Sequence, residues 1–158
     1  MADKFALPGG VLLVMLALLV GFAGWTDTFR RKIPNWLCAV TALLGLAYMG
    51  LQHGWHGAGL AFGHVAAALI VTIGLFALKI VGGGDAKFYA AMAAWLPIGQ
   101  APLLLASVAI AGLLLLVVFF AARMPGRARR RRESASDFDK LPYGVAIGLG
   151  GLAAVALA

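Results

Sequence analysis

The chain has 158 residues, of which 63% are hydrophobic and only 12% charged. Soluble domains usually carry about 25% charged residues, so this chain has too little polar surface to cover a water-soluble globule. Its long runs are apolar on every face, which excludes the alternating pattern of a membrane β-barrel. The single cysteine, Cys38, excludes a disulfide framework within the chain and any Cys-x-x-Cys metal module. Composition therefore predicts an all-α polytopic membrane protein.

The uncharged runs predict about six transmembrane helices, because one span needs about 20 apolar residues. The second long run is too long for one span and divides at the histidine- and glycine-rich segment 52–57, and a later run divides at the two prolines of segment 97–102. The predicted helices are residues 5–26, 33–51, 58–78, 85–96, 102–122 and 142–158. We treat residues 1–158 as a single integral-membrane domain.

The first apolar run has a second interpretation, since residues 11–23 resemble the apolar part of a signal peptide. The stronger basic cluster follows this segment instead of preceding it, and no clean cleavage site precedes Trp25. We therefore expect a retained helix.

Charge distribution sets the expected orientation. With six helices, the loops after the first, third and fifth contain all of the 13 basic residues except Lys4. The positive-inside rule places these loops in the cytoplasm, including an Arg-rich loop at about residues 123–140. We expect a multi-pass protein of the bacterial inner membrane. The net charge of +7 at the ends of apolar runs favours binding of anionic phospholipids over nucleic acid.

Two of the six acidic residues, Asp27 and Asp85, are predicted at helix ends on the cytoplasmic side. Ionisable groups close to the membrane are costly and indicate function. Two carboxylates in a low-dielectric site share one proton, so the charged member can activate water while the protonated member polarises a carbonyl. This pair predicts an aspartyl peptidase with Asp27 and Asp85 as catalytic residues.

Each aspartate also has a structural interpretation. Asp85 follows three glycines and opens a predicted helix, so it is a candidate N-cap. Asp27 precedes Arg30, Arg31 and Lys32 and is a candidate for a solvated ion pair with them. Two functions follow as alternatives to the peptidase: a non-enzymatic membrane assembly factor, or a proton-coupled transporter in which the carboxylates relay protons.

Two motifs carry a more specific resemblance. Asp27 is followed by Ile33-Pro34-Asn35, and residues Gly82-Gly83-Gly84-Asp85-Ala86-Lys87 form a G-x-G-D-x-K pattern. Together they resemble the signature regions of type IV prepilin peptidases, the GxGD-type aspartyl proteases. Residues 140–147, KLPYGVAI, resemble the start of that family's last helix.

The resemblance, which covers about residues 8–158, implies an endopeptidase that removes the leader of prepilins or pseudopilins at the cytoplasmic membrane face. The short chain resembles the form that serves tight-adherence (Flp-type) pili. The family resemblance also implies that Asp27 and Asp85 are the catalytic pair. Gly82 and Gly84 would allow a sharp bend and close approach of substrate, Lys87 would orient Asp85 or reach lipid headgroups, and the Pro34-Asn35 pair would support the site.

One departure from the family limits these expectations. Larger members of the family resemble enzymes with two functions, which cleave the leader and also methylate the new N-terminus of the product. These larger members carry a cytoplasmic insertion with paired Cys-x-x-Cys motifs. This chain has no such insertion and one cysteine, so we expect neither zinc nor N-methyltransferase activity, and no cofactor. The sequence leaves the substrate and the oligomeric state open.

The remaining polar and aromatic residues have simpler interpretations. The three histidines, which are far from the carboxylates, are interpreted as interfacial or packing residues: His53, His56 and His64. The tryptophans near segment ends are interpreted as membrane-interface anchors: Trp25, Trp36, Trp55 and Trp95. In the large cytoplasmic loop, Arg127–Arg132 are expected to bind lipid, and three acidic residues are candidate partners of a basic leader: Glu133, Asp137 and Asp139.

Overall fold

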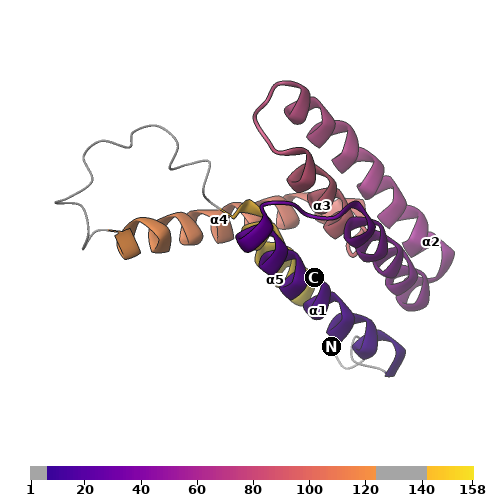
Figure 1. The fold of residues 1–158 in the computed structure, drawn as a ribbon. Coiled ribbons are helices and arrows are strands. Elements are labelled where there is room, and N and C mark those ends of the chain that lie inside the picture. Colours follow the sequence, from indigo (N-terminus) through magenta and orange to yellow (C-terminus); the bar gives the residue numbers. More distant parts are fainter. Residues whose placement is uncertain (1–6, 124–141) are drawn as a thin grey trace.

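A computed structural model of the protein describes residues 7–123 and 142–158. All regular structure in these two ranges is helical (Figure 1), which confirms the predicted all-α class. The elements are α1 (Leu7–Arg30), α2 (Asn35–Ala77), α3 (Gly83–Ala93), the short 3-10 helix η2 (Ile98–Gln100), α4 (Ala101–Arg123) and α5 (Tyr143–Leu157).

Three of the described helices are long and apolar enough to cross a membrane: Gly9–Arg30, Asn35–Ala77 and Ile98–Ala121. By contrast, α3 has 11 residues and α5 has 15. At about 1.5 Å per residue, neither covers about 30 Å of hydrocarbon by itself. The described helices thus fit a membrane protein, and the presence of six complete transmembrane spans stays a prediction.

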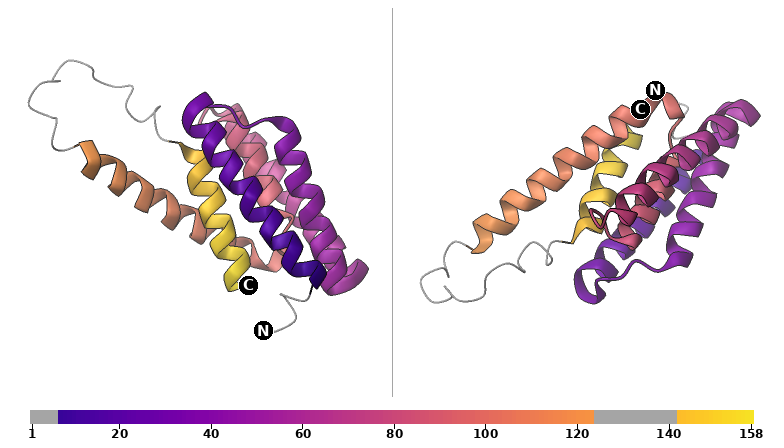
Figure 2. Two further views of the ribbon diagram at one scale, coloured as in Figure 1. Left: turned by 60° about the horizontal axis from the view of Figure 1, so that its bottom comes forward. Right: turned by 90° about the horizontal axis from the view of Figure 1, so that it is seen from above.

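Gly54 turns α2 into a helical hairpin. Its φ of 63° and ψ of −162° are not helical, and glycine adopts a positive φ without steric cost. A Cβ on Gly50 would lie 3.8 Å from the Cβ of Ala58, whereas residues eight apart in a straight helix are separated by about 12 Å. The chain therefore reverses direction here, as Figure 1 and Figure 2 show. The predicted break at residues 52–57 is confirmed, but within this segment only Gly54 has a non-helical backbone.

The short helix α3 is the centre of the bundle and packs against α2 and α5. Its Phe88 and Met92 are fully buried, and so is Trp95 just beyond it. The Trp95 indole N–H donates a 3.0 Å hydrogen bond to the Thr41 carbonyl, so the polar edge of the ring is satisfied inside the core. A Cβ on Gly45 would lie 2.7 Å from the Trp95 ring, so glycine makes room for it.

This burial corrects one interpretation of the tryptophans. Trp95 is only 1% exposed and is a core residue, not an interface anchor. The reason is the hairpin of α2, because both of its arms contact the residues after α3: Thr41 on the first arm bonds to Trp95, and His64 on the second arm bonds to Leu96. The other tryptophans are exposed, as an interface position requires: Trp25, Trp36 and Trp55.

Helix α4 is the least buried candidate span. It packs on α5 and meets η2 at its start, and its far end leans away from the other helices (Figure 2). The apolar side chains on its outer face, such as Leu105 and Val117, are exposed and suited to lipid.

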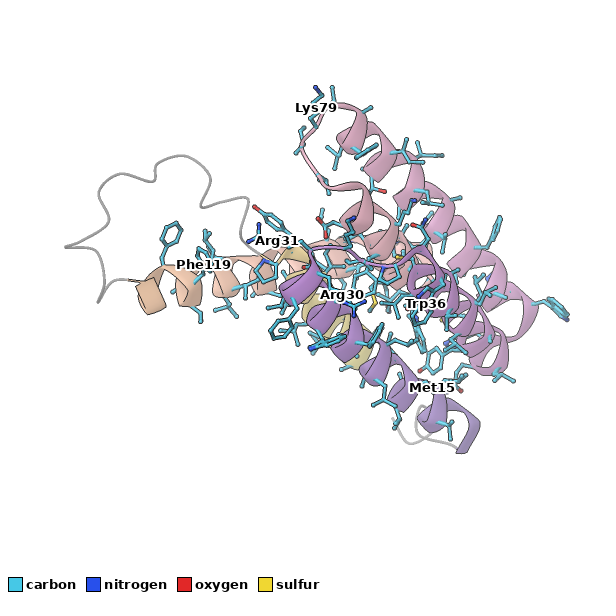
Figure 3. The ribbon with its side chains drawn as sticks, viewed as in Figure 1. Met15, Arg30, Arg31, Trp36, Lys79 and Phe119 are labelled. Atoms are coloured by element: carbon cyan, nitrogen blue, oxygen red, sulfur yellow. The ribbon has the colours of Figure 1, made fainter. Side chains whose placement is uncertain are left out.

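Helices α1 and α2 are each followed by a residue with left-handed backbone, Arg31 (φ 51°) and Lys79 (φ 59°) (Figure 3). After α2, the Ile80 amide donates to the Leu75 carbonyl at 3.0 Å and the Lys79 amide donates to the Phe76 carbonyl at 2.9 Å. This is the Schellman pattern, which closes a helix and redirects the chain. The two redirected connections, from α1 to α2 and from α2 to α3, meet at one end of the bundle.

Candidate active site

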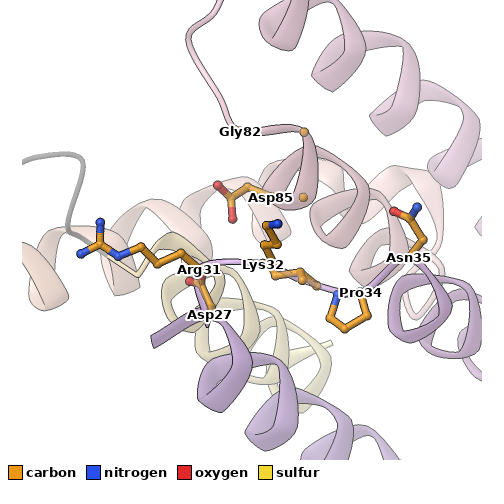
Figure 4. A pocket seen from close by; sticks show the side chains of 10 residues that line it. Asp27, Arg31, Lys32, Pro34, Asn35, Gly82 and Asp85 are labelled. Carbon is orange, nitrogen blue, oxygen red and sulfur yellow. The ribbon is translucent and has the colours of Figure 1, made fainter. Parts of the chain in front are cut away.

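A pocket of about 450 Å³ lies where these two connections meet (Figure 4). Its walls come from the end of α1, the start of α2 and the start of α3. The lining residues are Asp27, Arg31, Lys32, Ile33, Pro34, Asn35, Gly82, Gly83, Gly84 and Asp85. Every site residue predicted from the sequence, Lys87 excepted, therefore lines one pocket.

Two carboxylates face each other in this pocket. Asp27 comes from the last turn of α1 and Asp85 from the first turn of α3, and their side chains point toward one another (Figure 4). Asp85 lies outside the three candidate spans. Burial, and next to it the negative charge of Asp27, raise the pKa of Asp85 to about 6. Asp85 can therefore hold a proton close to neutral pH while its partner is ionised.

Asp85 is not the N-cap of its helix, so that structural interpretation is wrong. Helix α3 begins at Gly83, with Gly82 as N-cap and no side-chain capping bond. A Cβ on Gly82 would lie 2.8 Å from Oδ2 of Asp85. The Gly82 backbone (φ −67°, ψ 144°) is open to any residue, so what a larger residue there would disturb is the position of the Asp85 carboxylate and not the backbone.

Asp27 is held by the start of α5, from the far end of the sequence. The Gly144 amide donates a 2.7 Å hydrogen bond to Oδ2 of Asp27. The positive charge of Arg31 favours the ionised form of Asp27, which agrees with the ion-pair interpretation for this one of the three basic residues that follow Asp27. Asp27 is nevertheless half-buried and fixed by backbone, which a solvated ion pair would not be.

The close fit of Gly144 was not predicted from the sequence. A Cβ at this position would lie 2.8 Å from Oδ2 of Asp27 and 2.8 Å from Cδ1 of Ile33. The available signal is a glycine in the first turn of a helix directly after Pro142 and Tyr143, because glycine there lowers helix stability unless space requires it. The sequence does not reveal which neighbour occupies that space.

Lys87 faces a different partner from the one predicted. Its ammonium group donates a 3.0 Å hydrogen bond to Oδ1 of Asn35. This bond joins α3 to the start of α2 beside the pocket, and both partners are exposed to solvent or headgroups.

Among the described residues no group of three or more His, Cys, Asp or Glu side chains could hold a metal ion. His64 is buried, with Nδ1 at 3.1 Å from the Leu96 carbonyl oxygen, which confirms a packing role for this histidine. The predicted lipid-binding arginines and the acidic residues Glu133, Asp137 and Asp139 lie outside the described residues.

Apolar helices of spanning length and two facing carboxylates in one pocket define a helical membrane protein with a candidate acid–base site. The sequence matches the type IV leader peptidase family over residues 11–117, more than half of the chain. The chain therefore belongs to the type IV leader peptidase family, which confirms the resemblance to type IV prepilin peptidases and makes the protein a peptidase. Comparison with curated proteins and with solved structures gives no match. Both aspartates lie within the matched range, and α5 lies beyond it.

Proposed function

We propose that the protein is an aspartyl endopeptidase that removes the leader peptide of prepilins or pseudopilins, with Asp27 and Asp85 as its catalytic residues. The observation that carries this proposal is the pair of carboxylates facing each other across one pocket (Figure 4). Membership of a leader peptidase family supports it, and favours a peptidase over an assembly factor or a transporter.

The pair supplies both functions that peptide hydrolysis needs. The ionised carboxylate accepts a proton from water as the water oxygen bonds to the scissile carbonyl carbon, and the protonated carboxyl gives its proton to the carbonyl oxygen. The tetrahedral intermediate then returns a hydroxyl proton to the second carboxylate. The first carboxyl gives its proton to the leaving nitrogen as the C–N bond breaks. One water is consumed, and the pair regains its starting protonation.

We further propose that the pocket opens to the cytoplasm. Basic residues flank it on both connections, at Arg30 to Lys32 and at Lys79, and the positive-inside rule assigns such loops to the cytoplasm. A substrate helix in the bilayer would then present its leader junction at the pocket. The connection between α1 and α2 holds only the four residues between Arg30 and Asn35, which favours a peptidase without N-methyltransferase activity, of the short kind that serves tight-adherence pili.

The decisive experiment incubates the purified full-length chain in detergent with candidate prepilins and reads the product's new N-terminus by mass spectrometry. Asp27→Asn and Asp85→Asn should each lower kcat by about 100- to 10,000-fold, the range for loss of an acid–base group. Retained cleavage in either variant contradicts the catalytic pair. An assembly factor would instead support pilus assembly in both variants, and a transporter would move protons in vesicles without cleaving prepilin.

Orientation can be tested with single cysteines after Cys38→Ala. Lys79→Cys, on the connection to the pocket, should react with a membrane-impermeant maleimide only in inverted inner-membrane vesicles. Trp55→Cys lies at the hairpin turn, where the native side chain is 94% exposed, and should react only from the opposite side. Labelling of both positions from the same side contradicts the proposed topology.

A further inference from the structure

The two carboxylates of the pocket have unlike surroundings. Asp27 accepts a 2.7 Å hydrogen bond from the Gly144 amide. This amide belongs to the first turn of α5, where backbone N–H groups lack partners within the helix. Asp85 receives no hydrogen bond from any residue within 7–123 or 142–158. Backbone donors stabilise the ionised form of a carboxyl group, and burial without donors stabilises the protonated form.

We propose that the first turn of α5 holds Asp27 as the ionised member of the pair and leaves the shared proton on Asp85, with Gly144 as the positioning residue. Asp27 is then the general base that takes the proton of the attacking water, and Asp85 is the acid that protonates the scissile carbonyl. This assignment of roles rests on the proposed peptidase function.

The other charged groups near Asp27 do not replace this contact. Arg31 and Lys32, from the connection after α1, line the same pocket, and Asp85 faces it from α3. From α5 the nearest titratable side chain is Tyr143, which is 46% exposed. Arg31 also favours a charged Asp27, but it is a long side chain on an exposed connection. A backbone amide fixed in a helix also sets the direction in which the carboxylate points.

A side chain at position 144 would displace the Asp27 carboxylate, which lies where a Cβ would be. A Cβ there would approach both Oδ2 of Asp27 and Cδ1 of Ile33 to 2.8 Å. Gly144→Ala should therefore push the carboxylate away from the amide. We expect kcat to fall by about 100-fold, the loss that follows from a displacement of about 1 Å at a reacting group, with KM changed far less.

The acid limb of the pH profile of kcat/KM should move to higher pH in Gly144→Ala, because the ionised form of Asp27 loses its backbone donor. A purely structural role for Gly144 would lower activity at every pH without moving this limb. An unmoved limb in a folded Gly144→Ala enzyme overturns the proposal.

Two further variants separate the carboxylate from packing. Gly24→Ala lies at the same α1–α5 contact, where its Cβ would sit 3.4 Å from Val145, and should keep near wild-type activity. The double variant Gly144→Ala with Ile33→Val removes the Cδ1 atom but leaves the approach to Asp27. If the double variant regains activity, the defect is one of packing and the proposal fails; continued loss supports it.

Infrared spectroscopy tests the proton's position without any substrate. When the full-length protein is titrated from acid to neutral pH, the protonated-carboxyl band with a midpoint of about 6 should be lost in Asp85→Asn, whereas Asp27→Asn should keep a protonated-carboxyl band whose midpoint lies between 3.8 and about 6. The opposite result overturns the assignment even where prepilin is cleaved. The expected result in a protein that cleaves no prepilin would uphold the assignment of charge and contradict the peptidase function, so the two failures are distinguishable. This assay needs no Gly144 variant, and so does not depend on that variant's folding.

Discussion

The ammonium group of Lys87 on α3 lies 3.0 Å from Oδ1 of Asn35, at the start of α2, across a sequence separation of 52 residues. The bond ties the helix that carries Asp85 to the wall of the pocket formed by the connection between α1 and α2. We therefore expect Lys87 to act on Asp85 through the placement of this wall.

Breaking this bond should lower activity modestly and leave stability nearly unchanged, because both partners are exposed. We expect Lys87→Ala and Asn35→Ala each to lower kcat several-fold, and the double variant to be no worse than either. A double-mutant cycle should give a coupling of about 0.5–1.5 kcal/mol, typical of one net hydrogen bond. Strictly additive losses in prepilin cleavage would show that the two residues act independently.

Gly82 should be needed for the position of the Asp85 carboxylate. In Gly82→Ala the new Cβ would lie 2.8 Å from Oδ2 of Asp85, while the backbone at this position accepts alanine. We expect kcat to fall by about 10- to 100-fold with normal folding. Gly74→Ala, whose Cβ would have nothing within 4 Å, is the matched control and should retain activity.

Gly84 tests a different role from Gly82. Its Cβ would make only ordinary contacts, 3.7 Å from Ile33. If glycine is needed here for close approach of the substrate backbone, Gly84→Ala should raise KM more than it lowers kcat. A pure loss of kcat would assign Gly84 to the positioning of Asp85 instead.

The pH dependence of cleavage should carry the signature of Asp85. Its pKa of about 6 is raised, so the protonated form persists to higher pH than in a free carboxyl group. As the pH rises through about 6, Asp85 loses the proton that the donor step requires, and kcat/KM should fall.

Removing the partner's charge should move this titration in a defined direction. In Asp27→Asn the pKa of Asp85 should fall below about 6, because the charge of Asp27 is one of its two causes, and stay above 3.8, because burial remains. Since this variant is expected to be inactive, the titration is followed by carboxyl infrared bands. An unchanged midpoint would show that the two groups do not interact.

The packing of Trp95 predicts a contrast between two glycines of α2. In Gly45→Ala the Cβ would meet the Trp95 ring at 2.7 Å and the Ala94 backbone at 2.8 Å, so we expect destabilisation of about 1–3 kcal/mol from overpacking. Gly63→Ala on the other arm has nothing within 4 Å and should be neutral or stabilising by up to about 1 kcal/mol, since alanine favours helix. Unfolding in mixed detergent micelles, followed by Trp fluorescence, measures both. Equal stabilities would contradict the tight contact at Gly45.

The sequence predicted the helical class, the break near Gly54 and the two aspartates, because these depend on local properties. An apolar run of sufficient length must satisfy its own backbone and forms a helix in lipid. Asp27 and Asp85 stood out because charge near the membrane is rare. Helix ends were less well predicted: α1 continues to Arg30, so that Asp27 lies within its last turn, and α3 begins at Gly83 instead of Asp85.

The contacts between distant segments were decided by the tertiary structure alone. That Gly144 donates to Asp27, that Lys87 binds Asn35 and that Trp95 is buried against Thr41 all depend on the reversal at Gly54 and on the docking of α5 beside α1. Each is set by the relative placement of whole helices, which the composition of any one helix does not specify. The sequence thus determined which two carboxylates are candidates for the chemistry, and the packing decided how each is held. A backbone amide has no side-chain signature and becomes a hydrogen-bond donor to a carboxylate only where the fold brings the two together.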